Sequence, residues 1–201
     1  MTESATPEPE ARRKGPGLLP RDLALIALFA ALIAVLGLPG SFALFGAAVP
    51  ITAQTLGVML AGSILGAKRG FLAVLAFLAL VAAGLPLLAG GRGGIAAFAG
   101  PSGGYLFGWL LGVTVIGLLV RKSRTVPRLV LANALGGIVA IYLIGIPFTA
   151  WRVDSGFFAT VVSATQYLPG DAIKVVLSAL ITAGVARSYP IPEAGKRRGE
   201  G

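Results

Sequence analysis

Three ionisable residues lie in or beside apolar segments of the chain: Asp171 and Lys174 in YLPGDAIK, and Arg92 in the Gly-rich LAGGRGGIAAFAG. Ionisable side chains next to membrane-spanning segments are costly and usually mark a functional site. Asp171 and Lys174 are three residues apart after Pro169-Gly170, so on a helix they share one face. We expect Asp171 to accept N–H hydrogen bonds from a small polar ligand and Lys174 to neutralise an acid group.

Each of these residues also has a purely structural explanation. Asp171 in a first helical turn can satisfy free backbone N–H groups and the helix dipole, with Lys174 as its salt-bridge partner. A lone ion pair near lipid, however, gains little after desolvation. Arg92 either extends toward lipid headgroups or supplies a second cation, close to Lys174, for the ligand's carboxylate. Gln54 either links helices by hydrogen bonds or binds a ligand amide.

Aromatic residues near these motifs are further candidates. Tyr105 follows GPSGG at the start of an apolar segment, and we include it in the predicted binding site. The other aromatics are typical of core or membrane-interface positions rather than of ligand contacts, with Tyr142 and Trp151 typical of an aromatic belt. The core or interface group comprises Phe45, Phe98, Trp109 and Tyr167.

The residue types that are missing exclude much chemistry. The chain has no Cys and no His, which removes disulfides, thiol and His-based catalysis and most zinc sites. It has no GxxxxGK[ST] motif for binding nucleoside triphosphates. We therefore expect no enzymatic activity, no metal and no cofactor. A chain that drives its own transport usually buries acids near the membrane midplane, and the only candidate here is Asp171, near one end of its segment.

Composition indicates which elements position these residues. Of 201 residues, 56% are apolar and 12% are charged, about half the charged share of a soluble domain. The apolar surface must therefore face lipid, and about 20 apolar residues suffice for one spanning helix. We predict an all-α integral membrane bundle of six transmembrane helices: Leu23–Leu38, Pro50–Gly66, Phe71–Leu88, Gly103–Val120, Val126–Ile146 before Pro147, and Leu168–Ala186.

The basic residues predict the orientation of the bundle. Cytoplasmic loops of membrane proteins carry an excess of Lys and Arg. With the N-terminus inside, 14 of the 17 basic residues lie on the cytoplasmic side, and Arg92 and Arg152 lie outside. This bias predicts both termini in the cytoplasm and explains the net charge of +9 without nucleic acid. We expect a disordered tail over residues 1–20, a substrate-binding domain over 21–188 and a basic tail over 189–201.

The first predicted helix carries small residues four apart, Ala27 with Ala31 and Ala30 with Ala34. Such spacing lets helices approach closely. These alanines either pack within the bundle or form a docking face for another membrane subunit.

Three motifs together resemble one known family. VPITAQTLGVMLAGSILG, the Gly-rich stretch ending in GPSGGYLFG, and YLPGDAIK occur in this order, as in the BioY family, the biotin-specific S components of energy-coupling factor (ECF) transporters. The resemblance runs from about Leu23 to Ala186.

The resemblance implies a six-helix S component in the bacterial plasma membrane that binds biotin from the outside. It also implies partners: a transmembrane coupling (T) subunit and two cytoplasmic ATPases. The family's acid and lysine match Asp171 and Lys174, its loop arginine resembles Arg92, and its first-helix docking strip resembles the two alanine pairs. The alternatives are an S component for another small vitamin, an autonomous carrier and a membrane enzyme.

Overall fold

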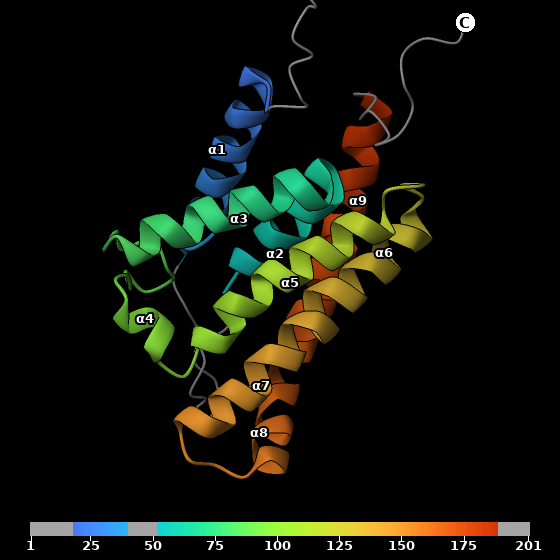
Figure 1. The fold of residues 1–201 in the computed structure, drawn as a ribbon. Helices are drawn as coiled ribbons and strands as arrows, with labels where there is room; N and C mark the ends of the chain where they lie inside the picture. The colour runs from blue at the N-terminus through green and yellow to red at the C-terminus, as the bar shows by residue number, and fades with distance from the viewer. Residues whose placement is uncertain (1–17, 40–51, 189–201) are drawn as a thin grey trace, which may run out of the picture.

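The computed structural model describes residues 18–39 and 52–188, and the regular elements among them are all helices (Figure 1). The predicted tail over 1–20 is therefore covered only from residue 18. The predicted tail over 189–201 and Phe45 lie outside the described residues. The helical content confirms the predicted all-α fold.

The helices of the described residues have the following order along the chain. The first is α1 (Pro20–Val35), and the next is α2 (Gln54–Leu60), which continues through the π-helical segment η1 (Ala61–Leu65). The remaining elements are α3 (Gly66–Ala82), the short α4 (Ala96–Ala99), α5 (Gly103–Leu119), α6 (Val126–Ala134), the π-helical η2 (Leu135–Ala140), α7 (Ile141–Arg152), α8 (Phe157–Ala164), the 3-10 turn η3 (Thr165–Tyr167) and α9 (Leu168–Ser188).

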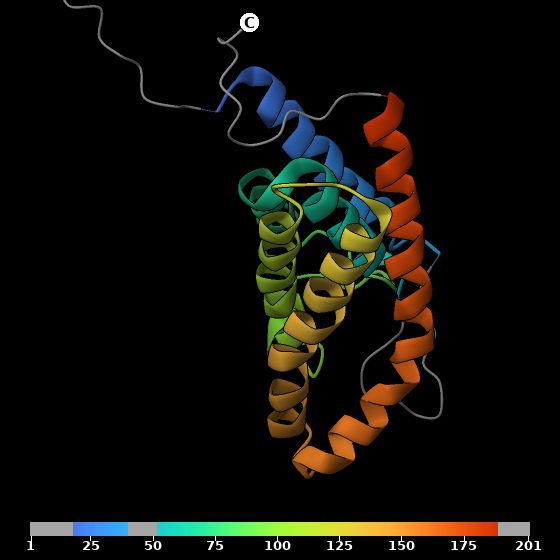
Figure 2. The same cartoon turned by 90° about the vertical axis from the view of Figure 1, so that its right-hand side faces the viewer.

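Helix α5 lies at the centre of the bundle and packs against α3 on one side and against η2 and α7 on the other. Helix α1 covers α3, while α9 packs along α2 and α6 and stands as a separate column beside them (Figure 2). Small residues bring the central helices together. A Cβ atom on Gly112 would lie 2.5 Å from the carbonyl oxygen of Gly136, so α5 and η2 touch backbone to backbone.

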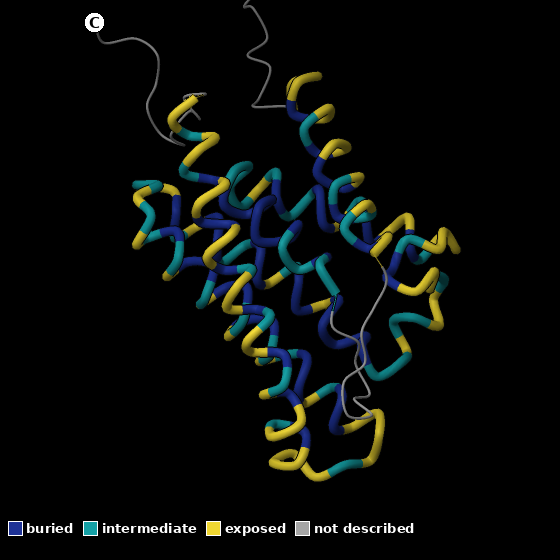
Figure 3. The backbone as a smooth tube through the Cα atoms, turned by 180° about the vertical axis from the view of Figure 1, so that it is seen from behind, coloured by how far each residue is buried: buried dark blue, intermediate teal, exposed yellow. Residues whose placement is uncertain are grey.

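The outer surface of the bundle is apolar. Leu143 and Val162 are each 69% exposed, and Ile173 is 62% exposed. Figure 3 shows buried backbone running through the middle of the molecule, with exposed residues on its outer faces. Three helical runs, Gln54–Ala82, Val126–Arg152 and Phe157–Ser188, are long and apolar enough to cross a membrane, and Gly103–Leu119 is a shorter apolar helix. Lipid is the environment that such a surface requires.

Several predicted boundaries were wrong. The third helix was expected over Phe71–Leu88, but α3 starts at Gly66 and ends at Ala82. Gly66 and Gly84 have φ of +78° and +105°, a left-handed backbone that glycine adopts easily, and these two residues set the turns at each end. The fifth helix was expected to end before Pro147, yet Pro147 lies inside α7, as membrane helices tolerate.

Helix α8 was not predicted at all. Its eight residues, Phe157–Ala164, are too few to suggest a membrane span by themselves. They lead through η3 directly into α9, so the last helical run is much longer than the predicted Leu168–Ala186.

Candidate functional site

The first two turns of α9 direct the charged residues Asp171 and Lys174 toward the interior. Asp171 is only 6% exposed, and its Oδ1 accepts a 2.9 Å bond from Lys174 Nζ. Lys174 Nζ also donates to the hydroxyl of Thr55 on α2, at 2.9 Å. Tyr142 on α7 donates to Oδ2 of Asp171 at 2.7 Å. The carboxylate thus bonds to side chains, not to the N–H groups of its own helix, and it joins α9 to α7.

Arg92 reaches the same region from a tight hairpin between α3 and α4. Leu88 and Arg92 exchange two backbone hydrogen bonds, of 3.0 and 3.2 Å. The chain reverses at Gly90 and Gly91, with φ of +78° and +70°, and both conformations favour glycine. The guanidinium of Arg92 donates through Nη1 to Ser102 Oγ at 3.2 Å and through Nε to Ala89 O at 3.3 Å. Its Nη2 has no partner within the described ranges.

Gln54 holds this hairpin against the bundle. Its side chain is 1% exposed. Its Nε2 donates to Ile33 O on α1 and Leu87 O, at 3.2 and 3.0 Å, while its Oε1 accepts from Ala89 N at 3.1 Å. The structure therefore confirms that Gln54 links chain segments by hydrogen bonds. Contact between Gln54 and a ligand stays a prediction.

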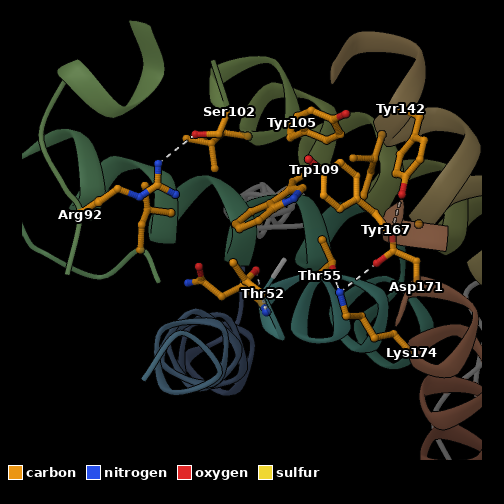
Figure 4. A pocket seen from close by; sticks show the side chains of 15 residues that line it. Thr52, Thr55, Arg92, Ser102, Tyr105, Trp109, Tyr142, Tyr167, Asp171 and Lys174 are labelled. Atoms are coloured by element: carbon orange, nitrogen blue, oxygen red, sulfur yellow. Dashed lines mark hydrogen bonds and ion pairs between the residues drawn. The ribbon is translucent and has the colours of Figure 1, made fainter. Parts of the chain in front are cut away.

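Aromatic side chains lie between the two polar groups (Figure 4). Tyr105 packs edge-on against Tyr142, with ring centroids 5.8 Å apart, and Trp109 and Tyr167 line the same space. Trp109 Nε1 is buried and has no hydrogen-bond partner among residues 18–39 and 52–188. An unpaired buried donor is uncommon, so this indole N–H is available to a ligand.

All five predicted site residues line one pocket, which is open on one side. The lining comprises Gln54, Arg92, Tyr105, Asp171 and Lys174 together with Thr52, Thr55, Leu88, Ser102, Leu106, Trp109, Gly137, Ile141, Tyr142 and Tyr167.

One predicted relationship within the pocket was wrong. Arg92 was expected close to Lys174, as a second cation for the same carboxylate. Figure 4 instead shows Arg92 with Ser102 at one end of the pocket and Lys174 with Asp171 at the other. Arg92 is exposed while Asp171 is buried, so the pocket has an open cationic end and a closed polar end. The distribution of basic residues predicted on which side of the membrane Arg92 and Lys174 lie. It could not predict how far apart they are within the pocket.

Sequence reasoning also missed several lining residues. Tyr142 was assigned to an aromatic belt, but its hydroxyl bonds to Asp171. Thr55 is one residue from Gln54, and Ser102 lies in the GPSGG motif, so proximity to a chosen motif was the signal that could have found them. Trp151, in contrast, is 71% exposed with Arg152 over its ring, as a belt residue would be.

The alanines of α1 do not all face outward. Ala27 and Ala31 are exposed and Ala34 is partly buried, whereas Ala30 is 5% exposed and packs in the core. Of the two pairs, only Ala27 with Ala31 lies wholly on an open face. Ala30 therefore belongs to packing within the bundle, and docking through Ala27 and Ala31 stays a prediction.

Comparison with known proteins settles the family. A model of the BioY family matches residues 6–191. The chain belongs to the BioY family. It is 47% identical over 180 residues to a biotin transporter BioY of Rhizobium etli, covering 85% of this chain and 96% of that protein. It is 45% identical over 183 residues to one of Rhodobacter capsulatus, covering 85% and 95%.

A solved structure is similar to this BioY chain as well. The crystal structure of the S component for biotin from an ECF-type ABC transporter has 33% sequence identity and a TM-score of 0.80, over 83% of this chain and 91% of that one. Membership in BioY, a family of transporter components, makes the chain a multi-pass membrane protein and not an enzyme.

Proposed function

We propose that this BioY chain is the S component of an ECF-type importer and binds biotin in the pocket between Arg92 and Asp171. The observation that carries the proposal is the separation of two polar ends by an aromatic wall (Figure 4). Biotin has the same layout, because its ureido ring and its carboxylate lie at opposite ends of an apolar body. The similar transporters of Rhizobium etli and Rhodobacter capsulatus, both named for biotin, support the choice of ligand.

The closed end suits the ureido group. A ureido group has two N–H donors and one carbonyl acceptor. Each oxygen of Asp171 accepts one bond within the protein and keeps a free lone pair, so it can accept from a ureido N–H. Lys174 Nζ uses two of its three donors, and the third is directed to the ureido oxygen.

The open end suits the carboxylate. Arg92 has its Nη2 donors unused, and Arg–carboxylate bonds are among the stronger hydrogen bonds in proteins. Between the ends, Tyr105, Trp109 and Tyr167 would enclose the apolar thioether ring and the aliphatic chain. In this arrangement Lys174 serves the ureido end, and Arg92 alone serves the acid.

The orientation and partners belong to the same proposal. Six spans cross the membrane with both termini in the cytoplasm: α1, α2 with η1, α3, α5, α6 through α7, and α8 through α9. In support, the start of α1, the end of α9 and the α5–α6 turn lie toward one side of the molecule, opposite the α7–α8 turn (Figures 1 and 2). A T subunit docks on the open face at Ala27 and Ala31, and two ATPases supply the energy.

Equilibrium binding of radiolabelled biotin to the purified full chain in detergent tests the proposal, with other vitamins as competitors. We expect saturable binding that only biotin analogues displace. Displacement by an unrelated vitamin would assign the pocket to that vitamin. No binding by a chain that elutes as a folded species would overturn the proposal. Biotin uptake by cells that lack T and ATPase subunits would instead make the chain an autonomous carrier.

A further inference from the structure

A second set of buried polar side chains lies outside the pocket lining. Ser63 on η1, Asn133 on α6, and Ser178 and Thr182 on α9 are each 0% exposed, and none of them lines the pocket. The three elements contact one another. Ser63 Oγ donates to Asn133 Oδ1 at 3.0 Å and thereby joins η1 to α6.

These residues extend the polar face of α9. Asp171, Lys174, Ser178 and Thr182 are spaced by three, four and four residues, which places them in one row along a helix. Thr182 lies eight residues beyond Lys174, or about 12 Å along the helix axis. The row therefore runs from the closed end of the pocket well into the other half of the bundle, where α9 packs on α6.

Three atoms in this set lack hydrogen-bond partners. Asn133 Nδ2, Ser178 Oγ and Thr182 Oγ1 are fully buried and have none within the described part of the chain. Hydroxyls in helices normally bond to a carbonyl one turn earlier, as Thr114 does to Leu110 O at 2.7 Å. Ser178 and Thr182 do not, and leaving such groups unpaired is unfavourable.

We propose that water fills this interface and that Ser63, Asn133, Ser178 and Thr182 form a hydrated seam between α9 and the rest of the bundle. Water both donates and accepts, so it can satisfy an amide donor as well as hydroxyls, and buried waters typically bond to such groups. A cation does not fit, because Asn133 Nδ2 is itself a donor. The proposal does not depend on which ligand the pocket binds.

The seam distinguishes α9 from the central helices. Helices α5 and η2 meet through direct backbone contact at Gly112 and Gly136, which leaves no space for water. Water-mediated contacts can exchange partners while the helices slide.

Met59 is a natural reporter for this water. It is 0% exposed and packs in the apolar cluster that contains Val175 and Ala179 of α9. The only other Met is at position 1. Short X-ray pulses convert bound water to hydroxyl radicals, which oxidise adjacent thioethers within a folded protein. The variant Leu78→Met supplies the control, because Leu78 is also buried, at 4% exposure, but lies in the main apolar core.

We expect Met59 to be oxidised at least about fivefold faster than the thioether introduced by Leu78→Met, measured in the same chain by mass spectrometry. The double variant Ser178→Ala/Thr182→Val should slow Met59 oxidation at least about threefold, because its side chains no longer hold water. If that variant loses its fold, Ser178→Ala alone provides the comparison. Equal slow oxidation at both sites would overturn the proposal, as would unchanged Met59 oxidation in the variant, which would assign the water to the pocket.

Discussion

Tyr142 donates a 2.7 Å hydrogen bond to Oδ2 of Asp171, the carboxylate oxygen that Lys174 leaves unused. The bond crosses from α7 to α9 and fixes the plane of the carboxylate before any ligand enters. Tyr142→Phe removes only this hydroxyl. We expect biotin affinity to fall about three- to tenfold, the effect of one net hydrogen bond, measured by equilibrium binding.

A double-mutant cycle with Asp171→Asn separates this role of Tyr142 from a direct ligand contact. If Tyr142 acts by orienting Asp171, adding Tyr142→Phe to Asp171→Asn causes little further loss. Additive losses would mean that the Tyr142 hydroxyl touches the ligand independently of Asp171.

Asp171→Asn itself should weaken biotin binding by roughly 10- to 100-fold, because hydrogen bonds to a charged group contribute about 1.5–3 kcal/mol. Asp154→Asn is the matched control, since Asp154 is an exposed acid in the α7–α8 turn. Its φ of +50° is a conformation that Asn also tolerates. An unchanged affinity in Asp171→Asn would make Asp171 a purely structural link between α9 and α7.

Arg92→Gln tests which end of the ligand lies at the open end of the pocket. The variant should bind biotin about tenfold more weakly, yet bind biotin amide as well as the unmodified chain does, because the amide has no carboxylate to pair. Arg152→Gln, an arginine stacked on the exposed Trp151, should leave both affinities unchanged. If Arg92→Gln lost the same affinity for biotin and for biotin amide, the ligand's carboxylate would not be bound by Arg92.

The sequence singled out residues that line one pocket, but it did not predict how they are arranged there. Asp171, Lys174 and Arg92 stood out because charge in an apolar segment is costly, and this argument needs no structure. The placement of these residues at two ends of the pocket depends on the hairpin at Gly90 and Gly91. No periodic pattern in the sequence predicts where such a hairpin lies in the fold. The hydroxyl of Tyr142 looked like that of any interface aromatic until α7 and α9 were placed together.

Helix boundaries show the same limit. Apolar content predicted that Leu85–Leu88 would extend the third helix. Gly84 adopts a left-handed conformation, however, and Leu87 O and Ala89 N bond instead to Gln54. Pro147 was expected to end a helix by the rule for soluble proteins, whereas α7 continues to Arg152. Both errors come from tertiary contacts or lipid overriding a local preference.

Gln54→Ala should destabilise the fold and the Arg92 hairpin together. The change leaves Ile33 O, Leu87 O and Ala89 N without their side-chain partner, at about 1 kcal/mol for each lost bond. We expect a lower unfolding temperature and weaker biotin binding. Gln166→Ala is the control, because within residues 18–39 and 52–188 the Gln166 side chain bonds only to Ser163 in its own turn. Unaltered stability in Gln54→Ala would contradict the linking role of Gln54.

Bulky substitutions on the two faces of α1 should have different effects on binding and uptake. Ala31→Trp places a large ring on the exposed face, so biotin binding should stay within about twofold while uptake by cells containing T and ATPase subunits is lost, since small residues permit close helix contact. Ala30→Trp forces the same ring into the core, where Ala30 is 5% exposed, and overpacking is destabilising. That variant should lose binding and uptake together.

Leu143→Trp controls for a bulky residue on the membrane surface as such, because Leu143 is 69% exposed on α7, a helix without contacts to α1 among the principal packing pairs. Its binding and uptake should both persist. Uptake that survives Ala31→Trp would show that the partner docks elsewhere on the bundle. If Leu143→Trp also lost uptake, any bulky residue on the membrane surface would disturb transport. The result for Ala31→Trp would then not support a docking face on α1.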